Sequence, residues 1–397
     1  MDDLEGYARH WSDARRRVES HLFWPGEPTR DDRSVLVAGC GTSQAAKYAL
    51  RWPRAKVVGI DVSLASIQFT ARLKRKYGLD NLELRQLPIE RAGELGAAFE
   101  HIVCTGVLHH LPDPDAGLAA LRQVLAEQGA LHLMVYAPYG RAGVYLLQDY
   151  CRRLGLRPTK AAIADLALSL RDLPPDHPLV PLLRASPDFR SEAGIADALL
   201  HPQDRAYAVP ELFAFLERAG FAFGRWIRQA PYRSDCGALA TSPHRRLLDR
   251  LPAEEGYAAA ELFRGTMVRH GLTAYGDART ANANQTSFEG GGWPDYVPIR
   301  MLEAIAVRDR LPVGASAVLI NQGHSYTDLY LPIDARQSGL AAAIDGKRSI
   351  SQIARGRASS AEVRAFFQQL WAYDQVVFDT SRTGLSARAP AASPGAG

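Results

Sequence analysis

The chain has 397 residues, of which 47% are hydrophobic and 23% charged, and its formal net charge at pH 7 is +4. This length and composition predict a globular protein of more than one domain, and the small charge argues against a nucleic-acid-binding surface. No run of residues approaches the roughly 18–20 apolar residues of a membrane span. The start of the sequence lacks the apolar core of a signal peptide, so we expect a cytoplasmic protein with no membrane partner.

The cysteines are scattered rather than paired. None of the four lies close to another in a zinc-binding or dithiol spacing, so the sequence predicts no metal site and a reducing compartment. They are Cys40, Cys104, Cys151 and Cys236.

Residues 34–139 alternate between strand-like and helix-like segments. The former are short runs rich in apolar and β-branched residues, and the latter carry apolar residues at intervals of three and four. The expected strands are 35–38, 56–61, 82–86, 101–108 and 130–136, and the expected helices are 43–52, 63–77 and 113–129. Gly78 and Gly129 are interpreted as the ends of the second and third helix. This order predicts βαβ units and a parallel sheet that binds ligands at the carboxyl ends of its strands.

The rest of the chain divides by composition. In chain order we expect an N-terminal helical segment (1–33), the strand–helix core (34–139), a helical insertion or cap (140–205), the remainder of the first domain (206–279), a linker (280–295), a small module (296–381) and a disordered tail (382–397). In the N-terminal segment, His10 and Trp11 either cover a ligand or belong to a helix that only docks on the core.

The stretch VLVAGCGTSQ (35–44) places two glycines between a buried strand and a helix, and Asp61 ends the next strand. Glycines let a ligand approach the backbone, helix N-terminal amides donate hydrogen bonds, and an acid 20 residues after Gly41 accepts from ribose hydroxyls. The arrangement therefore predicts an adenosine-binding site. The alternative is a plain glycine turn with a structural aspartate. A dinucleotide is disfavoured, because the third glycine of GxGxxG is replaced by Gln44.

The sequence around this loop resembles the class I S-adenosylmethionine (SAM)-dependent methyltransferases. The glycine loop is similar to the family's first motif, KVVGIDVS (56–63) to its second-strand motif, and residues 99–138 to its region around strands four and five. The resemblance is continuous over about residues 33–138 and looser to about 278. It implies an α/β, Rossmann-like, mostly parallel sheet with an antiparallel seventh strand, SAM as the cofactor, and methyl transfer as the activity.

The resemblance also implies roles for particular residues. The two glycines would cradle the methionine part of SAM, Asp61 would bind the ribose, Val62 and the backbone at Ile89 would flank the adenine, and the backbone after the fourth strand would face the sulfonium. The implied cofactor-binding residues are Gly39, Cys40, Gly41, Asp61, Val62, Ile89, Thr105 and Gly106.

Three positions depart from the family pattern. Val37 stands where an acid is common, Ser43 replaces the third glycine of the methyltransferase loop (a different position from that of the dinucleotide motif), and Pro88 stands near the expected adenine site. These departures leave open a SAM-binding regulatory or assembly protein without catalytic activity.

The candidate catalytic residues are His109 and His110, which follow the fourth strand at the ligand edge of the sheet. A histidine of ordinary pKa, about 6.5, is a suitable general base at neutral pH. The alternative is that the pair only lines the pocket. The further candidates for the substrate pocket are Tyr136, Tyr139, Arg205 and Tyr207.

Residues 331–379 resemble, more weakly, the peptide-binding winged-helix domains of ribosomally made peptide pathways, with DGKRSI (345–350) as the shared turn. A small α+β winged-helix-like module of this kind suits a peptide or protein acceptor, whereas the helical cap suits a small molecule. Both acceptor classes stay open, as does a homodimer. RNA methylation is a further alternative, disfavoured because the chain has no basic run.

Overall fold

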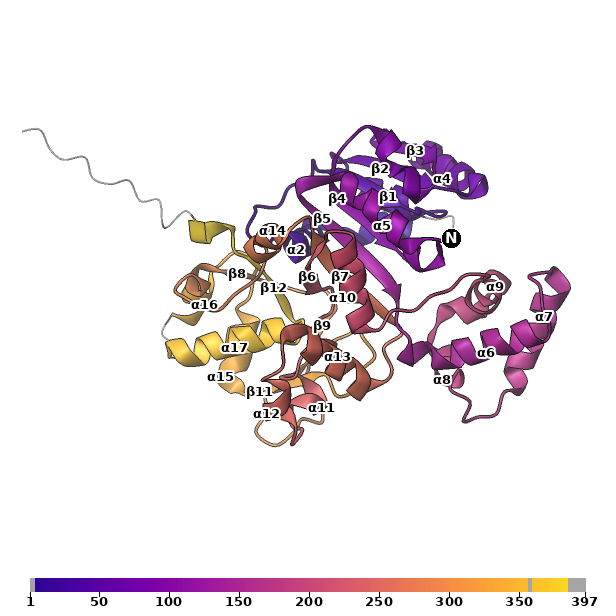
Figure 1. Ribbon diagram of the computed structural model, residues 1–397. Coiled ribbons are helices and arrows are strands. Elements are labelled where there is room, and N and C mark those ends of the chain that lie inside the picture. The colour runs from indigo at the N-terminus through magenta and orange to yellow at the C-terminus, as the bar shows by residue number, and fades with distance from the viewer. Residues whose placement is uncertain (1–3, 356–358, 385–397) are drawn as a thin grey trace, which may run out of the picture.

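The computed structural model describes residues 4–355 and 359–384 (Figure 1). Its central sheet has seven strands in the order β3-β2-β1-β4-β5-β7-β6. The pairs among β1 to β5 are parallel, and β7 pairs antiparallel with both β5 and β6. The strands are β1 (Ser34–Ala38), β2 (Lys56–Asp61), β3 (Leu82–Gln86), β4 (Phe99–Thr105), β5 (Leu125–Tyr136), β6 (Ala222–Trp226) and β7 (Arg269–Tyr275). The predicted α/β sheet with an antiparallel seventh strand is confirmed.

Alternate side chains of each strand supply two cores, one on each face of the sheet. In β1, Val35 and Val37 pack on one face, and Leu36 and Ala38 pack on the other. Residues of α3 (Gln44–Arg51) and α4 (Leu64–Tyr77) complete the first core. Those of α5 (Pro114–Gln123), α10 (Val209–Arg218) and α13 (Ala253–Arg264) complete the second.

The strand order reverses between β1 and β4. From β1 the chain builds outward to β2 and β3, and then crosses to the other side for β4 and β5. The segments after β1 and β4 are therefore free to separate above the sheet, which is where open parallel sheets bind ligands.

The prediction that a helix extends to Gly129 is wrong. Helix α5 ends at Gln123, and β5 begins at Leu125. The pairing shifts register between Phe99 and His101, so residues before Ala130 form an irregular extension of the strand. A Cβ on Gly129 would lie 2.9 Å from the carbonyl oxygen of Phe99, which explains why glycine stands there.

Four α-helices between β5 and α10 have a core of their own, built from Val144, Leu147, Leu166 and further apolar residues. In Figure 1 they lie to one side of the sheet rather than on either face. They are α6 (Ala142–Arg153), α7 (Lys160–Ser169), α8 (Val180–Ala185) and α9 (Glu192–Leu200).

The region after β7 holds two small sheets, β12-β8 and β11-β10-β9, and another apolar core. Its strands are β8 (Val297–Arg300), β9 (Ala304–Val307), β10 (Ala317–Asn321), β11 (Tyr330–Ile333) and β12 (Val376–Asp379). Its helices are α14 (Ala278–Ala283), α15 (Ala335–Ala342), α16 (Ile350–Ala354) and α17 (Ser360–Ala372). The winged-helix interpretation of this region and the domain boundaries given above stay predictions. Of the expected disordered tail, residues 385–397 lie outside the described residues.

The N-terminal helices are α1 (Glu5–His10) and α2 (Asp13–Phe23). Helix α2 lies between the central sheet and the β8–β12 pair, because Leu22 and Phe23 pack with both Tyr275 of β7 and Val377 of β12. Nearer the start of α2, Arg17 donates to the carbonyl oxygen of Gly346 at 2.7 Å. One helix from the start of the chain therefore joins the sheet to the C-terminal region.

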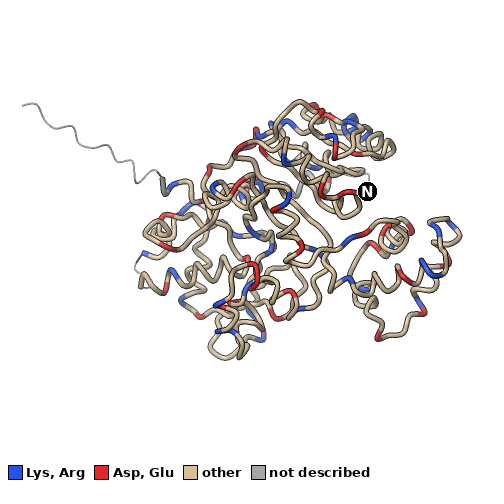
Figure 2. Tube along the Cα trace, viewed as in Figure 1, with Lys and Arg blue, Asp and Glu red and all other residues tan. Residues whose placement is uncertain are grey.

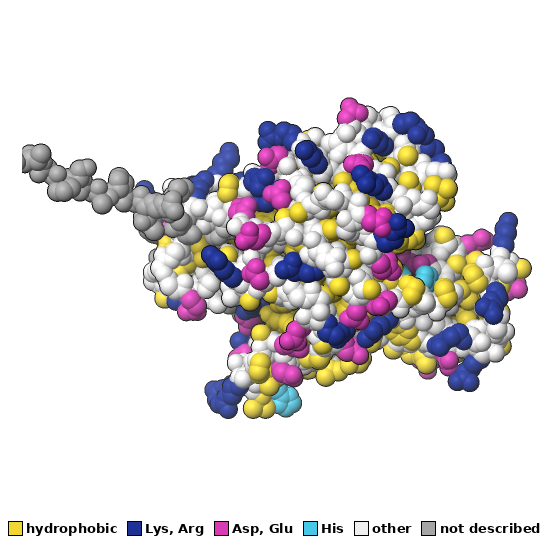
Figure 3. All heavy atoms as spheres, turned by 45° about the horizontal axis from the view of Figure 1, so that its top comes forward, with side chains coloured by type: hydrophobic (Ala, Val, Ile, Leu, Met, Phe, Trp, Pro, Cys, Tyr) yellow, Lys and Arg dark blue, Asp and Glu magenta, His cyan; other side chains and the backbone are white. Residues whose placement is uncertain are grey.

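Short helical turns complete the connections. The α-helical ones are α11 (Gly237–Ala240) and α12 (Arg245–Leu248), and the 3-10 turns include η1 (Ile89–Leu95), η2 (Leu108–His110), η3 (Tyr139–Arg141), η6 (Ala230–Tyr232) and η7 (Trp293–Asp295). Basic and acidic residues are interspersed along the chain and over the face shown in Figure 3 (Figures 2 and 3). Among the described residues, no helix combines the length and apolar character that crossing a membrane requires.

Candidate functional site

The glycine loop between β1 and α3 has two different requirements for glycine. Gly39 and Gly41 both have left-handed backbone angles, with φ of 66° and 55°. A Cβ on Gly39 would lie 2.5 Å from Val107 Cγ2, whereas a Cβ on Gly41 would meet nothing within 4 Å. Gly39 is therefore needed for the close packing of two loops, and Gly41 presents open backbone beside a cavity.

Asp61 holds this loop in place. The Gly41 N–H donates to Asp61 Oδ2 and the Ser63 N–H donates to Asp61 Oδ1, both at 2.8 Å. Thr70 Oγ1 donates to the carbonyl oxygen of Gly41 at 3.1 Å. Each carboxylate oxygen has two lone pairs, so Asp61 can accept two further hydrogen bonds from a diol.

A cavity of about 690 Å³ begins at the glycine loop. The parts of the chain that enclose it are the N-terminal segment with α1 and α2, residues 39–51, the end of β4, His132 of β5, the segment directly after β6, and the loop between β8 and β9. The lining residues include Tyr7, Trp11, Arg15, Glu19, Gly39, Cys40, Gly41, Gln44, Lys47, Arg51, Thr105, Gly106, Val107, His132, Arg228, Met301 and Glu303. Gln44 Nε2 donates to Thr105 Oγ1 at 2.6 Å, which joins the start of α3 to the end of β4 at the floor of the cavity.

Arg51 closes one wall of the cavity. Its guanidinium pairs with the buried carboxylate of Glu19, donates to the hydroxyl of Tyr7, and lies 3.7 Å from the ring centroid of Trp11. Burial raises the pKa of Glu19, against the influence of Arg51. These contacts fix α1 and α2 over the cavity. Trp11 lies at the cavity, as the N-terminal prediction proposed, and the side chain of His10 lies outside the described residues.

The cavity has more positive than negative groups. Arg228 pairs with Glu303 at 3.6 Å, and Arg51 pairs with Glu19. Arg15 and Lys47 also line the cavity, and neither forms an ion pair with any other described residue. These two cations suit the carboxylate of a ligand.

At the predicted adenine position, Val62 is 63% exposed and Ile89 is buried, and neither is among the residues that line the large cavity. The backbone N–H of Leu87 donates to the carbonyl oxygen of Asp61, so the segment before η1 is tied to the end of β2. Burial raises the pKa of the Cys40 thiol to about 12, with a further contribution from Asp61, so this cysteine is a neutral packing residue.

His109 and His110 are not among the residues that line the large cavity. The turn η2 directs them toward the insertion, where the ring of His109 is buried against Tyr136 with centroids 3.9 Å apart. Burial, with smaller contributions from His110, Arg141 and His201, lowers the pKa of His109 to about 2. A group with that pKa is a poor general base at neutral pH. A catalytic role for this pair stays a prediction.

The four candidates for the substrate pocket lie near this pair. The N–H of Tyr207 donates to the carbonyl oxygen of Tyr136 at 2.9 Å, and that of Arg205 donates to the carbonyl oxygen of His109 at 3.0 Å. Tyr207 is fully buried, whereas Tyr139 is 40% exposed. These residues therefore gather on the insertion side of the β4 end, away from the glycine loop.

Sequence reasoning missed several lining residues. Lys47 and Arg51 stand one helical turn apart after the glycine loop, and this spacing is a readable signal for one shared face. Glu303 carries no such signal, because only the packing of the C-terminal region brings it to the cavity.

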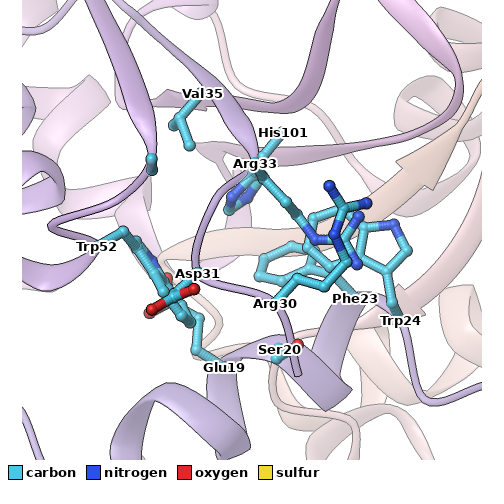
Figure 4. Close-up of a pocket in the computed structure, with 11 residues that line it drawn as sticks. Glu19, Ser20, Phe23, Trp24, Arg30, Asp31, Arg33, Val35, Trp52 and His101 are labelled. Carbon is cyan, nitrogen blue, oxygen red and sulfur yellow. The ribbon is translucent and has the colours of Figure 1, made fainter. Parts of the chain in front are cut away.

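A second cavity, of about 20 Å³, lies under α2 (Figure 4). Figure 4 shows Arg33 beside Trp24, with its guanidinium 3.8 Å from a ring centroid of Trp24, and His101 behind it. This volume accommodates about one water molecule. The small cavity therefore cannot be a cofactor site.

Comparisons with known proteins agree with this geometry. Residues 36–131 match the family model described as a methyltransferase domain. An uncharacterized protein of Synechococcus is 33% identical over 198 residues, which is 48% of this chain and 47% of that relative. The trans-aconitate 2-methyltransferase of Deinococcus radiodurans is 34% identical over 121 residues, 30% of this chain and 44% of that enzyme. The chain thus matches less than half the length of these curated relatives.

The similarity to solved structures extends over most of the chain. PKMT2 from Rickettsia typhi, in complex with AdoHcy, superposes with a TM-score of 0.62 at 13% identity, over 91% of this chain and 72% of that protein. This likeness shows a shared fold that extends beyond the seven-stranded sheet into the C-terminal region.

Proposed function

We propose that this chain, whose residues 36–131 match a methyltransferase domain, is a class I SAM-dependent methyltransferase that transfers the methyl group of SAM to an acceptor bound in the large cavity. The observation that carries the proposal is the junction of the glycine loop, whose Gly41 N–H donates to Asp61, with the end of β4 at one wall of that cavity. This junction lies at the strand-order reversal of the sheet, where such folds bind ligands.

Each part of SAM has a matching group. Asp61 would accept from the ribose hydroxyls, and Val62 and Ile89 would flank the adenine. Gly41 would lie against the methionine part, whose carboxylate would meet Lys47 and Arg15. When bound, SAM supplies an activated methyl group, so the protein has chiefly to align the acceptor and exclude water.

The N-terminal helices and the β8–β9 loop would exclude water, because Trp11 and Met301 line the cavity from these two elements. His132 is the histidine of the cavity wall. Burial lowers its pKa to about 4, with a further contribution from Arg51, so the ring is neutral at neutral pH. A neutral imidazole can accept a hydrogen bond from the hydroxyl or amine group of the substrate that is to be methylated.

The acceptor is proposed to be a small molecule or one side chain of a peptide. The cavity volume of about 690 Å³ falls within the usual range of small-ligand pockets, and SAM would fill a large part of it. A relative is named a trans-aconitate 2-methyltransferase, which favours a small acid, and the positive lining is consistent with one. The contribution of the C-terminal region to the wall favours a peptide instead.

The first test is calorimetric titration of the purified protein with SAM, S-adenosylhomocysteine and NADH. We expect micromolar binding of the two adenosyl ligands and none of NADH. Binding of NADH alone would overturn the proposal. The next test incubates the protein with methyl-labelled SAM and either a panel of carboxylic acids or a peptide library. Tight SAM binding without label transfer to either set would favour the alternative, a regulatory SAM-binding protein.

A further inference from the structure

Polar side chains gather where the helical insertion returns to the sheet. His109 and His110 come from η2, and Asp204 comes from the segment between α9 and α10. One ligand-type atom from each of these three residues lies within 4.8 Å of the other two. We infer that His109, His110 and Asp204 form a binding site for a divalent transition-metal ion, with zinc as the best match.

The first argument is that ligand atoms are buried without partners. Neither ring nitrogen of His109 nor Oδ1 of Asp204 has a hydrogen-bond partner among the described residues. His109 is 1% exposed, and the side chain of Asp204 is 2% exposed. Buried polar atoms in native proteins are nearly always satisfied, so their concentration at one point indicates a bound species.

The second argument is that the other atoms of the same residues are already held. Asp204 Oδ2 accepts from Gln148 Nε2 at 2.8 Å and from Arg141 at 3.4 Å, which leaves Oδ1 turned toward the histidines. His110 Nδ1 lies 3.0 Å from the carbonyl oxygen of Gln203 and 4.0 Å from Asp204 Oδ1, so the ring would bind the metal either through Nε2, with the Nδ1 proton kept on Gln203, or through Nδ1 after that contact is given up. Metal ligands in proteins typically have outer partners of this kind.

The third argument is geometric. Because the three ligand-type atoms lie within 4.8 Å of one another, a metal ion placed between them would be within about 2.8 Å of each. Zinc needs about 2.0–2.2 Å to nitrogen and oxygen ligands. Movements of under about 1 Å by three side chains would close that difference. Two imidazoles and one carboxylate, with a fourth position left open, suit Zn²⁺.

Arg141 opposes a second cation, and this limits the expected affinity. Its guanidinium lies 3.5 Å from the ring centroid of Tyr136 and reaches the outer oxygen of Asp204 rather than Oδ1. We therefore expect micromolar rather than picomolar zinc binding. The site does not depend on the proposed methyl transfer, because none of its three ligands lines the large cavity.

The test uses tag-free full-length protein, stripped with EDTA and titrated with Co²⁺, whose visible d–d absorption reports tetrahedral nitrogen and oxygen coordination. We expect one Co²⁺ per chain, displaced by Zn²⁺. Affinity should fall at least tenfold in His109→Ala and in Asp204→Asn. The matched control is His244→Ala, since His244 is an exposed histidine before α12 and should leave binding unchanged.

Two results would overturn the inference: no saturable d–d absorption at millimolar Co²⁺, or binding that both substitutions leave intact. Circular dichroism of each variant reports whether it folds. Where His109→Ala or Asp204→Asn fails to fold, His110→Gln replaces it, since it removes the ligand nitrogen from a partly exposed position and keeps a polar side chain.

Discussion

The end of β4 and the turn η2 that follows it place polar groups in opposite environments. Thr105 and Gly106 face the large cavity, where backbone groups and the cations Lys47 and Arg15 are open to a ligand. Only three residues further on, His109 is enclosed by the insertion, with both ring nitrogens lacking described partners. The 3-10 turn η2 redirects the chain between them. Closeness to the glycine-loop motif in sequence therefore does not place a side chain in the large cavity.

The largest expected effect concerns the cavity wall. Arg51→Met should lower the free energy of unfolding at pH 7 by about 3–5 kcal/mol, because it leaves the Glu19 carboxylate buried and unpaired. Burial raises the pKa of Glu19, so the penalty belongs to its ionised form and should shrink as pH falls toward about 4.5. Urea unfolding at both pH values measures this. The double variant Glu19→Gln, Arg51→Met should recover most of the loss at pH 7, and equal losses at both pH values would contradict the explanation.

The next effect separates the two glycines of the cofactor loop. Gly39→Ala should cost about 3 kcal/mol of stability, because a Cβ there overlaps Val107 and the backbone angle is left-handed. Gly41→Ala has the same kind of backbone angle but open space, so it should cost only about 1 kcal/mol. Urea unfolding compares the pair. Equal losses would show that the overlap with Val107 is relieved by a small shift of that side chain.

The buried ring of His109 should make the free energy of unfolding depend on pH. The pKa of His109 is lowered from 6.5 to about 2, chiefly by burial, so below pH 6.5 the unfolded state binds a proton that the folded state does not. Stability should therefore fall with falling pH, with a share from His109 of about 2 kcal/mol by pH 5. His109→Phe should remove that share when unfolding is measured in EDTA. A pH slope unchanged by the substitution would mean that the ring titrates normally in the folded protein.

On the cofactor side, Asp61→Ala should weaken SAM binding at least tenfold, about 1.4 kcal/mol, because two hydrogen bonds to the ribose and the tie to Gly41 are lost. Asp61→Asn retains one acceptor oxygen and should give an intermediate loss. Calorimetric titration measures both. An unchanged affinity in the alanine variant would remove Asp61 from the site.

The smallest expected effect tests the charge of the cavity. Lys47→Met should weaken SAM binding about two- to fivefold, about 0.5–1 kcal/mol, and the loss should diminish in high salt. Lys160→Met is the control, since Lys160 is an exposed lysine at the start of α7 on the insertion. A loss of the same size in both variants would argue against a specific carboxylate contact at Lys47.

The parts of the fold that were predictable depend on local pattern. The apolar run at residues 35–38, the glycines that follow and the acid at Asp61 are all short-range signals, and together they locate the sheet edge and its loop. Gly129 misled the same reasoning, because a glycine that permits an irregular strand pairing reads in sequence like one that ends a helix.

The parts of the site that were not predictable arise from long-range packing. Glu19 reaches Arg51 across 32 residues of sequence, and Glu303 reaches the cavity only after the whole C-terminal region has folded. The direction of His109 was equally hidden, because the turn after β4 and the insertion decide it together. Residue type and spacing carry no information about which of two adjacent spaces a loop faces.

The position of α2 between the central sheet and the β8–β12 pair has a consequence for biosynthesis. Helix α2 leaves the ribosome well before its partners in the C-terminal region, since contacts such as that of Arg17 with Gly346 span 329 residues. The seven-stranded sheet can form before those partners exist. Helix α2, which lines the cavity, cannot pack against both the sheet and the β8–β12 pair until β12 has been synthesised. We therefore expect the newly made chain to acquire its sheet early and its enclosed large cavity last, so that ligand access is widest while synthesis is still under way.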